Sequence, residues 1–249
     1  MKTYGLIGYP LSQSFSQKYF SDKFKNESIA ARYLNFPIAS IDELPQLLAK
    51  HPYIGGLNVT IPYKEKVMDY LTEIDPMAEE AGAVNVVKLD WSHASRPKLK
   101  GFNTDIIGFS ESIKPLLKAQ HKNALILGTG GAAKAVGFAL EKMDIAYQFV
   151  SRSPQGQNQT IYEALNAETM AQNTIIINTT PLGMYGDMEA KPDIPYQYTS
   201  KQHLFFDLIY NPTLSAFLKA GQDQGASVKN GLEMLHLQAE AAWEIWNRE

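Results

Sequence analysis

The chain has 249 residues, of which 45% are hydrophobic and 20% charged, with a formal net charge of −3 and no cysteine. This length can bury the core of one large domain or of two small ones, and the charge gives no reason to expect binding to nucleic acid or to an anionic membrane. The lack of cysteine excludes disulfides and thiolate chemistry and fits a reducing compartment, so we expect a cytoplasmic protein.

Membrane and metal sites are not expected either. No apolar run approaches the ~18 residues that a membrane helix needs, and the run before Pro10 is too short for the core of a signal peptide. The five histidines lie far apart, with no pair at i, i+3 or i+4, which argues against a metal site. We interpret them as surface residues or singly hydrogen-bonded core residues.

The first part of the chain alternates short apolar runs with segments of helical periodicity. The pattern predicts strands over residues 4–8, 32–36 and 55–59, and helices over residues 16–24, 41–50 and 64–71. Such alternation is typical of a parallel sheet with helices on its faces. Residues 84–89 and 98–102 flank a polar stretch and predict a hairpin added at the edge of this sheet.

A second unit begins near Thr104 and repeats the alternation. The pattern predicts helices over residues 106–117 and 132–143, and strands over residues 123–127, 146–150, 174–178 and 204–207. At least four strands in this arrangement indicate a doubly wound sheet. Residues 181–200 show no periodicity, and so long a loop in a compact domain is usually functional or mobile. A last helix is predicted over residues 232–246.

The turn after the strand at residues 123–127 fits the dinucleotide pattern G-x-G-x-x-G/A. Its glycines are Gly128, Gly130 and Gly131, and Ala132 and Ala133 follow. The first glycine permits a tight turn, the second lets backbone approach a pyrophosphate, and the small Ala133 lets helix and strand pack closely. The free N–H groups and positive dipole end of the helix favour phosphate.

The end of the next strand indicates which dinucleotide is bound. An NAD site usually has Asp or Glu about 20 residues on, where it binds the ribose 2′-hydroxyl. This chain has Ser151-Arg152-Ser153 there, with no acid. A guanidinium beside two hydroxyls suits a 2′-phosphate, which a carboxylate would repel, so we predict NADP as the cofactor.

Polar residues also cluster after predicted strands of the first unit, where ligands bind in open α/β sheets. Residues 8–16 follow the first strand, residues 58–64 the third, and residues 101–105 lie at the junction of the units. Two of these groups have simpler explanations. Ser14 and Ser16 could cap a helix, and Lys64 and Asp105 could form a surface ion pair.

Together these segments resemble the shikimate dehydrogenase family over nearly the whole chain. The matching motifs are Ser14-Phe15-Ser16, Asn58-Val59-Thr60-Ile61-Pro62-Tyr63-Lys64, Ala81-Gly82-Ala83-Val84-Asn85, Asn103-Thr104-Asp105, the glycine loop, Asn178-Thr179-Thr180-Pro181-Leu182-Gly183, Asp207-Leu208-Ile209-Tyr210-Asn211-Pro212-Thr213, and the closing Asn230-Gly231-Leu232, Met234-Leu235 and Gln238-Ala239. A glycine loop alone is unspecific, whereas this ordered set is highly specific.

The resemblance implies a role for each matched position. The substrate carboxylate would be held by Ser14, Ser16 and Tyr210, and the ring hydroxyls by Thr60, Asn85, Asp105 and Gln238. Lys64 would lie at the carbon that changes oxidation state, with Asp105 as the second catalytic residue. The cofactor would be bound by Gly128, Gly130, Gly131, Ala132, Ser151, Arg152, Ser153, Thr179 and Gly231, with Gly231 against the nicotinamide.

The resemblance also implies that the last helix returns to the first domain. We therefore predict an α/β protein of two domains. Residues 1–103 plus 226–249 would form a substrate-binding catalytic domain with a mainly parallel sheet, and residues 104–225 a Rossmann-type NADP domain. The implied activity is the reversible NADP-dependent reduction of 3-dehydroshikimate to shikimate in chorismate biosynthesis, by a monomer or homodimer without a nucleic-acid, membrane or metal partner.

The chemistry agrees with these roles. Hydride transfer to a ketone creates a developing alkoxide that needs a nearby cation or proton donor. Lys64 can supply both, and Asp105 can orient it while accepting a hydroxyl hydrogen bond. Two departures concern the loops. Gln13 and Gln17 stand where the family usually has His and Pro, and Pro154-Gln155 follows where another basic residue is common.

Three other functions remain open. A quinate/shikimate dehydrogenase that also uses NAD must accommodate an extra hydroxyl near the carboxylate, and the Ser14/Ser16 pair favours shikimate only modestly. A non-catalytic dinucleotide-binding regulator would be expected to lack Lys64 or Asp105, and both are present. A methyltransferase with a glycine-rich loop would leave Arg152 and the cluster at residues 58–64 unexplained.

Overall fold

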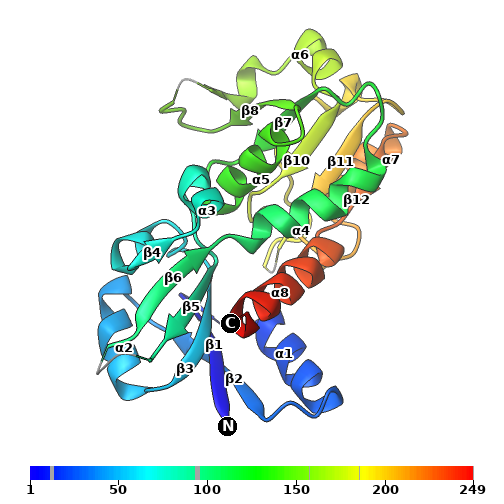
Figure 1. Ribbon diagram of the computed structural model, residues 1–249. Helices are drawn as coiled ribbons and strands as arrows, with labels where there is room; N and C mark the ends of the chain where they lie inside the picture. Colours follow the sequence, from blue (N-terminus) through cyan, green and yellow to red (C-terminus); the bar gives the residue numbers. More distant parts are fainter. Residues whose placement is uncertain (12–13, 93–95, 157, 185, 249) are drawn as a thin grey trace. The chain divides into compact units, whose positions relative to one another are not determined.

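The computed structural model describes residues 1–11, 14–92, 96–156, 158–184 and 186–248. The chain forms two compact units (Figure 1), the first made of Met1–Thr104 with Ala239–Glu249 and the second of Asp105–Gln238. It passes from one unit to the other at the start of α4 (Thr104–Ile113) and within α8 (Leu232–Asn247). Across the described residues, no helix is long and apolar enough to cross a bilayer.

The described part of the first unit is built on a sheet of six strands in the order β2-β1-β3-β5-β6-β4. The strands are β1 (Lys2–Gly8), β2 (Ala31–Pro37), β3 (Ile54–Val59), β4 (Glu73–Ile74), β5 (Val86–Asp90) and β6 (Lys98–Phe102). β1 pairs in parallel with β2 and β3, and β5 and β6 form the predicted antiparallel hairpin. Its expected place at the edge is wrong, because β4 pairs with β6.

Both faces of this sheet are covered. Alternate residues of β1 point to opposite sides, so Ile7 joins a core that includes Leu44 of α2 (Leu44–Lys50), while Tyr4 and Leu6 join a second core. That second core contains Phe20 of α1 (Phe15–Asn26). The first face also carries α3 (Pro76–Ala81) and two 3₁₀ turns, η1 (Ile41–Glu43) and η2 (Lys66–Tyr70), the latter within the helix predicted over residues 64–71.

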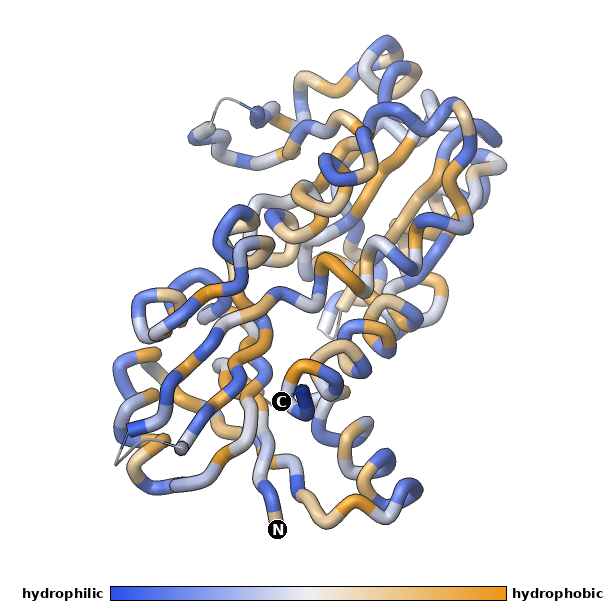
Figure 2. Tube along the Cα trace, viewed as in Figure 1, coloured by the Kyte–Doolittle hydropathy of each residue, from blue (hydrophilic) through white to orange (hydrophobic). Residues whose placement is uncertain are grey.

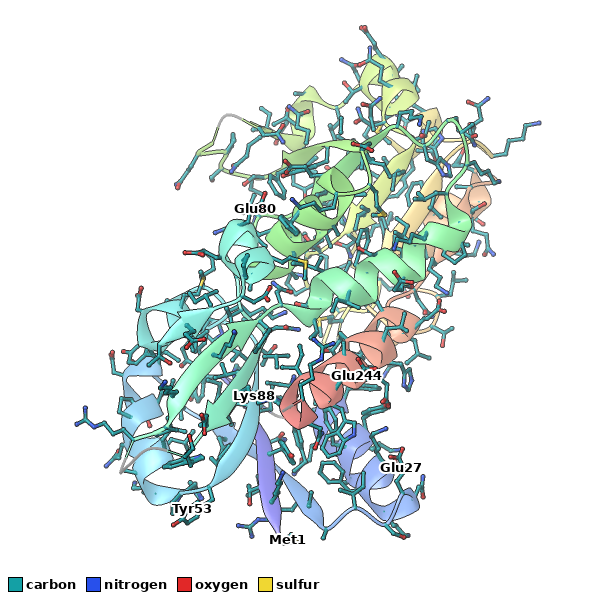
Figure 3. The ribbon with its side chains drawn as sticks, viewed as in Figure 1. Met1, Glu27, Tyr53, Glu80, Lys88 and Glu244 are labelled. Atoms are coloured by element: carbon teal, nitrogen blue, oxygen red, sulfur yellow. The ribbon has the colours of Figure 1, made fainter. Side chains whose placement is uncertain are left out.

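The end of α8 is anchored to the first sheet. The indole N–H of Trp246 donates to the carbonyl of Val87 at 3.1 Å, and a methyl group on Gly56 would come within 2.2 Å of the same indole nitrogen. The ammonium of Lys88 on β5 donates to the carbonyl of Arg248. Figure 3 shows Lys88 on β5 and Glu244 on α8. Truncating so tightly packed a Trp costs about 3–5 kcal/mol in typical cores, so the returning helix is integral to the first unit.

In the described residues the second unit has an all-parallel sheet in the order β12-β11-β10-β7-β8-β9. The strands are β7 (Asn123–Leu127), β8 (Ala146–Val150), β9 (Gln159–Thr160), β10 (Ile175–Asn178), β11 (Leu204–Asp207) and β12 (Ser227–Lys229). Numbered within the unit, this is the Rossmann order 3-2-1-4-5-6, and the strand order reverses between β7 and β10. Figure 2 shows β7, β10 and β11 as apolar segments, as strands buried on both faces must be.

Helices cover both faces of this sheet. Phe217 of α7 (Ala216–Asp223) packs with Phe205, and Met170 of α6 (Ala167–Gln172) joins the same core. Phe206, the next residue of β11, points the other way and meets Phe109 of α4 at 5.1 Å between ring centroids. The remaining elements are α5 (Gly131–Glu141) and the short turns η3 (Lys114–Leu116), η4 (Tyr162–Ala164) and η5 (Tyr196–Tyr198).

Residues 226–238 lie in the second unit, whereas the sequence had placed them with the first domain. The physical reason is twofold. β12 pairs in parallel with β11, extending the second sheet. The first half of α8 also packs closely on α4, since a methyl group on Gly108 would lie 2.5 Å from the carbonyl oxygen of Met234. The short β12 gave no periodicity by which sequence alone could assign it.

Candidate active site

The polar edge of the first unit lies where β1 and β3 end. The N–H of Thr60 donates to the carbonyl of Ile7 at 3.0 Å. A methyl group on Gly8 would lie 2.4 Å from Cγ2 of Thr60, so the two strand ends are in close contact. Asn85 arrives at this edge from the antiparallel side, because its carbonyl accepts from Val59 N–H at 2.8 Å. The structure thus brings Thr60 and Asn85 to one edge.

Both serines lie at the start of α1, beside this edge. Ser14 is the N-cap, and its Oγ accepts from Gln17 N–H at 3.2 Å, so the capping interpretation is confirmed for Ser14. A hydroxyl that accepts can still donate its own proton, and Ser14 therefore keeps a donor for an anion. Ser16 hydrogen-bonds the hydroxyl of Tyr33, whose pKa burial raises well above the usual value.

Tyr33 and Asn58 form a buried hydrogen-bonded pair, which is joined to Ser16 through the Tyr33 hydroxyl. The Tyr33 hydroxyl donates to Oδ1 of Asn58 at 2.6 Å, and Asn58 is 5% exposed. The sequence motif contained Asn58 without giving it a role. Its signal was a polar residue ending an otherwise apolar strand. Gln17 also has a structural partner, since its Oε1 accepts from Asn35 at 3.0 Å. Gln13 lies outside the described residues.

Lys64 follows the buried Tyr63 on the loop after β3. The Tyr63 hydroxyl donates to the carbonyl of Ile38 at 2.6 Å, and the carbonyl of Lys64 accepts from Val84 N–H at 2.7 Å. The first bond anchors the Tyr63 side chain and the second holds the Lys64 carbonyl, while the Lys64 side chain is half-buried. The loop therefore presents Lys64 from a rigid support, which a positioned proton donor requires.

Asn85 also fixes the start of α4. Its Oδ1 accepts from Thr104 N–H at 2.7 Å, and its Nδ2 donates to Thr104 Oγ1 at 3.1 Å. Asp105 comes next, in the first turn of α4, where a helix dipole favours a carboxylate. Asp105 is only 7% exposed. Its position follows from Asn85, which the sequence had assigned to the substrate alone.

In the second unit the glycine turn lies at the point where strand order reverses. Gly128 has φ +114°, a conformation that side chains strain. A methyl group there would lie 2.7 Å from Oγ1 of Thr179, at the end of β10. That hydroxyl donates to the carbonyl of Leu127 at 2.7 Å and so joins the ends of β7 and β10. Gly128 and Thr179 are therefore neighbours, as the cofactor prediction needs.

The helix that follows has an open N-terminus. The N-cap is Gly130, with no side-chain cap and no acidic residue in the first turn of α5. A methyl group on Gly130 would meet nothing within 4 Å. The helix packs tightly on the sheet, with Ala133 1% exposed and a methyl group on Gly137 only 2.8 Å from the Tyr147 ring. The first amides of α5 thus have no side-chain cap, and no side chain stands at Gly130, which fits a pyrophosphate.

Arg152, the basic residue of the predicted cofactor site, lies just after the end of β8. Ser151 is held by a hydrogen bond from its N–H to the carbonyl of Thr160 at 2.9 Å, and Ser153 N–H donates to Ser151 Oγ at 3.2 Å. Arg152 is exposed between them, and in the described part of the chain no carboxylate forms an ion pair with it. Burial raises the pKa of Tyr162, and the Arg152 charge nearby opposes that shift. The residues fit a 2′-phosphate.

Three further predicted residues lie after β11, between β12 and α8, and on α8 itself. Gly231 N–H donates to the carbonyl of Ile209 at 3.1 Å, and a methyl group on Gly231 would lie 2.2 Å from the carbonyl oxygen of Leu208, so only glycine fits. Tyr210, next to Ile209, is half-buried. Gln238 is 7% exposed and its Nε2 donates to its own helix at Leu235.

A buried polar cluster at the ends of β10 and β11 was not assigned from sequence. Asp207 accepts from Nδ2 of Asn178 at 3.0 Å and from the hydroxyl of Ser215. Burial raises the pKa of Asp207 to about 6. Asn178 and Asp207 each end an apolar strand in the sequence, which is the same kind of signal that Asn58 gave. No group of three or more potential metal ligands occurs among the residues that the structure describes.

The strand order, the glycine turn at the reversal point and the open helix N-terminus define a dinucleotide-binding α/β protein. Residues 6–87 match the family model of the shikimate dehydrogenase substrate-binding domain. A shikimate dehydrogenase (NADP⁺) of Methanococcus maripaludis is 38% identical over 98% of this chain and 91% of its own. By these similarities the chain belongs to the shikimate dehydrogenase family.

Solved structures agree with this relationship. The shikimate dehydrogenase of Aquifex aeolicus superimposes with a TM-score of 0.86 at 31% identity, over 99% of this chain and 92% of its own. The shikimate 5-dehydrogenase of Thermus thermophilus, in complex with NADP(H) and shikimate, gives a TM-score of 0.84 at 28% identity, over 99% and 94% of the two chains. The two-domain architecture with a Rossmann-type unit is therefore confirmed.

Proposed function

We propose that this chain catalyses the reversible NADP-dependent reduction of 3-dehydroshikimate to shikimate, a step of chorismate and aromatic amino-acid biosynthesis. The observation that carries the proposal is similarity along nearly the entire chain to relatives named as NADP⁺-dependent shikimate dehydrogenases. The enzyme is thus an oxidoreductase that acts on a CH–OH group. We place it in the cytoplasm, as a monomer or homodimer, and the absence of cysteine supports a reducing compartment.

In this proposal the first domain supplies four of the substrate-binding residues, Ser14, Ser16, Thr60 and Asn85. Ser14 and Ser16 bind the carboxylate in this scheme, and Tyr210 is proposed to bind it as well. Thr60 and Asn85 bind ring hydroxyls from the edge of the first sheet, where the structure has them side by side with rigid backbone. Asp105 and Gln238 accept and donate to the remaining hydroxyls, and both are nearly buried, which strengthens their hydrogen bonds.

The second domain binds NADP in this proposal. The amides at the start of α5 bind the pyrophosphate, Gly128 and Thr179 form the floor of the turn, and Arg152 with Ser151 and Ser153 binds the 2′-phosphate. Gly231 gives the nicotinamide a surface free of side chain. The cofactor supplies the hydride, and the protein supplies orientation and exclusion of water.

Lys64 acts on the substrate oxygen at the carbon that is reduced. Its ammonium stabilises the negative charge that develops on that oxygen and gives up a proton from Nζ to complete the alcohol. In the reverse direction the neutral amine takes the hydroxyl proton. Asp105 is the second catalytic residue, accepting a hydrogen bond from a substrate hydroxyl.

A spectrophotometric assay at about 340 nm with shikimate and quinate, each with NADP and NAD, tests the proposal. We expect turnover of shikimate with NADP to exceed that of the other three pairs. Comparable turnover of quinate with NAD would make the chain a quinate/shikimate dehydrogenase. If no pair is turned over by folded protein, the catalytic assignment fails, and a dinucleotide-binding regulator is the better interpretation.

A further inference from the structure

A buried polar network joins three loops at the carboxyl ends of β10 and β11. We call it the Asp207 network, and its members are Asn178, Thr180, Asp207 and Ser215. Asn178, Asp207 and Ser215 are fully buried. All contacts described below lie within the second unit.

Asp207 is the acceptor at the centre of the network. Its Oδ1 accepts from Nδ2 of Asn178 and from the N–H of Ile209, each at 3.0 Å, and its Oδ2 accepts from the Ser215 hydroxyl. Ser215 is at the same time the N-cap of α7, because its Oγ accepts from Leu218 N–H at 3.3 Å. Three donors converge on one carboxyl group, an arrangement that favours its ionised form.

On one side the network reaches the glycine turn. Oδ1 of Asn178 accepts from the N–H of Thr180 at 3.0 Å and from its hydroxyl at 2.7 Å. Between these residues stands Thr179, whose N–H and hydroxyl both donate to the carbonyl of Leu127, just before Gly128. The orientation of Asn178 therefore determines how the β10 loop lies against the phosphate-binding turn.

On the other side the network reaches Gly231. Ile209 gives its N–H to Asp207 and accepts at its carbonyl from Gly231 N–H at 3.1 Å. Leu208 N–H is tied to the carbonyl of Asn178 at 3.0 Å, and the carbonyl oxygen of Leu208 lies where a side chain on Gly231 would stand. The backbone between Asp207 and Tyr210 is thus fixed at both ends.

We propose that Asp207 is a positioning residue for the cofactor, holding the Thr179–Thr180 loop and the Ile209–Gly231 contact at a fixed spacing so that the phosphate and nicotinamide ends are bound together. This inference rests on the proposed function, since Gly128, Thr179 and Gly231 are cofactor residues only there. Asp207 acts through backbone and does not touch substrate in this scheme.

The ionisation of Asp207 gives the proposal a measurable signature. Burial raises its pKa to about 6, so the carboxyl group becomes protonated as pH falls through that value and loses acceptor strength. Tyr196 of η5 faces Asp207, and Asp193 lies near Tyr196. Burial, reinforced by the Asp207 charge, raises the pKa of Tyr196 so far that it stays neutral. Cofactor affinity should therefore weaken below pH 6 in the folded protein.

The experiment measures the dissociation constants of NADPH and NADH by nicotinamide fluorescence between about pH 5 and 8. NADH is needed because the 2′-phosphate of NADPH itself titrates near pH ~6. The variants are Asp207→Asn, which cannot ionise, and Ser215→Ala, which removes one donor to the carboxylate. His203→Gln is the matched control, since His203 is buried at the other end of β11 and its ring bonds Ser200 and the carbonyl of Met170.

We expect wild-type affinity for both cofactors to fall below pH 6, and Asp207→Asn to bind roughly tenfold more weakly at pH 7.5 with no such fall for NADH. Ser215→Ala should move the midpoint of the fall to higher pH. The control should lose thermal stability without changing either dissociation constant. A wild-type profile for NADH that is flat, or equal losses in Asp207→Asn and the control, would overturn the proposal.

Two outcomes separate this inference from the proposed function. If Asp207→Asn does not fold, Ser215→Ala still decides it, because an unmoved midpoint contradicts the role of Asp207. If the wild type binds cofactor with the expected profile but does not turn over shikimate, the proposed function fails while the positioning of the cofactor loops stands.

Discussion

The two units build their sites from different materials. In the second unit the predicted cofactor contacts are largely backbone, from Gly128, Gly130 and Gly231 and the first amides of α5. In the first unit the predicted contacts are side chains, such as those of Ser14 and Lys64, held on loops at a mixed sheet edge. A backbone site is specified by where side chains are absent, and a side-chain site by which ones are present.

The contrast has a consequence for substitutions. Replacing a side chain of the first unit should change chemistry or substrate affinity and leave cofactor binding almost untouched. In the second unit most side-chain changes should be silent toward cofactor. The expected exceptions are Arg152, which recognises a phosphate by charge, and the Asp207 network, which holds the cofactor loops. The following predictions test this division, from the largest effect to the smallest.

Lys64→Ala should lower kcat by about 10²–10⁴-fold, the usual contribution of a general acid-base group. The KM for shikimate should change much less, because the ammonium acts mainly in the transition state. Steady-state assays of purified, folded protein measure both constants. Lys66→Ala, an exposed lysine two residues on, is the control and should be unaffected. Near wild-type kcat in Lys64→Ala would mean that the proton comes from elsewhere.

Ser14→Ala and Ser16→Ala should each raise the KM for shikimate by roughly tenfold or more, as expected for a lost hydrogen bond to a charged group. The KM for NADP should stay the same. Because Ser14 also caps α1, Ser40→Ala is the matched control: Ser40 caps η1 in the same unit. It should cost similar stability with no change in either KM. An unchanged shikimate KM in both serine variants would remove the carboxylate assignment.

Arg152→Ala should lower the NADP/NAD ratio of kcat/KM by roughly tenfold, since ~1.4 kcal/mol of lost interaction corresponds to that factor. Activity with NAD should be nearly unchanged, because the proposed partner of the guanidinium is the 2′-phosphate, which NAD lacks. Equal losses with both cofactors would instead assign Arg152 to the support of the loop. Arg248→Ala, at an exposed residue just after the end of α8, is the control.

The smallest expected effect concerns stability below neutral pH. Burial lowers the pKa of His121, so the folded state resists its protonation. The unfolded state takes up the proton near pH ~6.5. The contribution of His121 is therefore full above that pH and lost as pH falls below it. Melting temperatures measured between about pH 5 and 7.5 should fall less steeply in His121→Gln than in the wild type.

Strands with strong apolar runs were predictable almost to the residue. β7, β8 and β11 have the predicted bounds. In β7 and β11 four consecutive buried residues between polar turns leave little choice. Short elements were not. α3, α6, α7, β4, β9 and β12 were missed, because two to eight residues carry too little periodicity to outweigh local polarity. Tertiary packing decides such elements, as Phe217 of α7 shows by filling the core against Phe205.

The candidate site divides in the same way. The glycine spacing, Arg152 and the motif from Asn58 to Lys64 identified the dinucleotide, its phosphate and the family from sequence alone, because each residue type there has few alternatives chemically. The connections between these positions came only from the tertiary structure. Nothing in sequence joins Tyr33 to Ser16 and Asn58, or Asp207 to Asn178 and Ser215.

Sequence therefore indicated the family, the cofactor and the candidate site residues of this protein. The tertiary structure decided which hydrogen-bond partners hold those residues. Asn178 and Asp207 illustrate the difference, since in the sequence each is only a polar residue at the end of an apolar strand. They become partners only because β10 and β11 are neighbours in register. The physical reason is that burial makes an unsatisfied polar group costly, so partners far apart in sequence must be brought together by the fold.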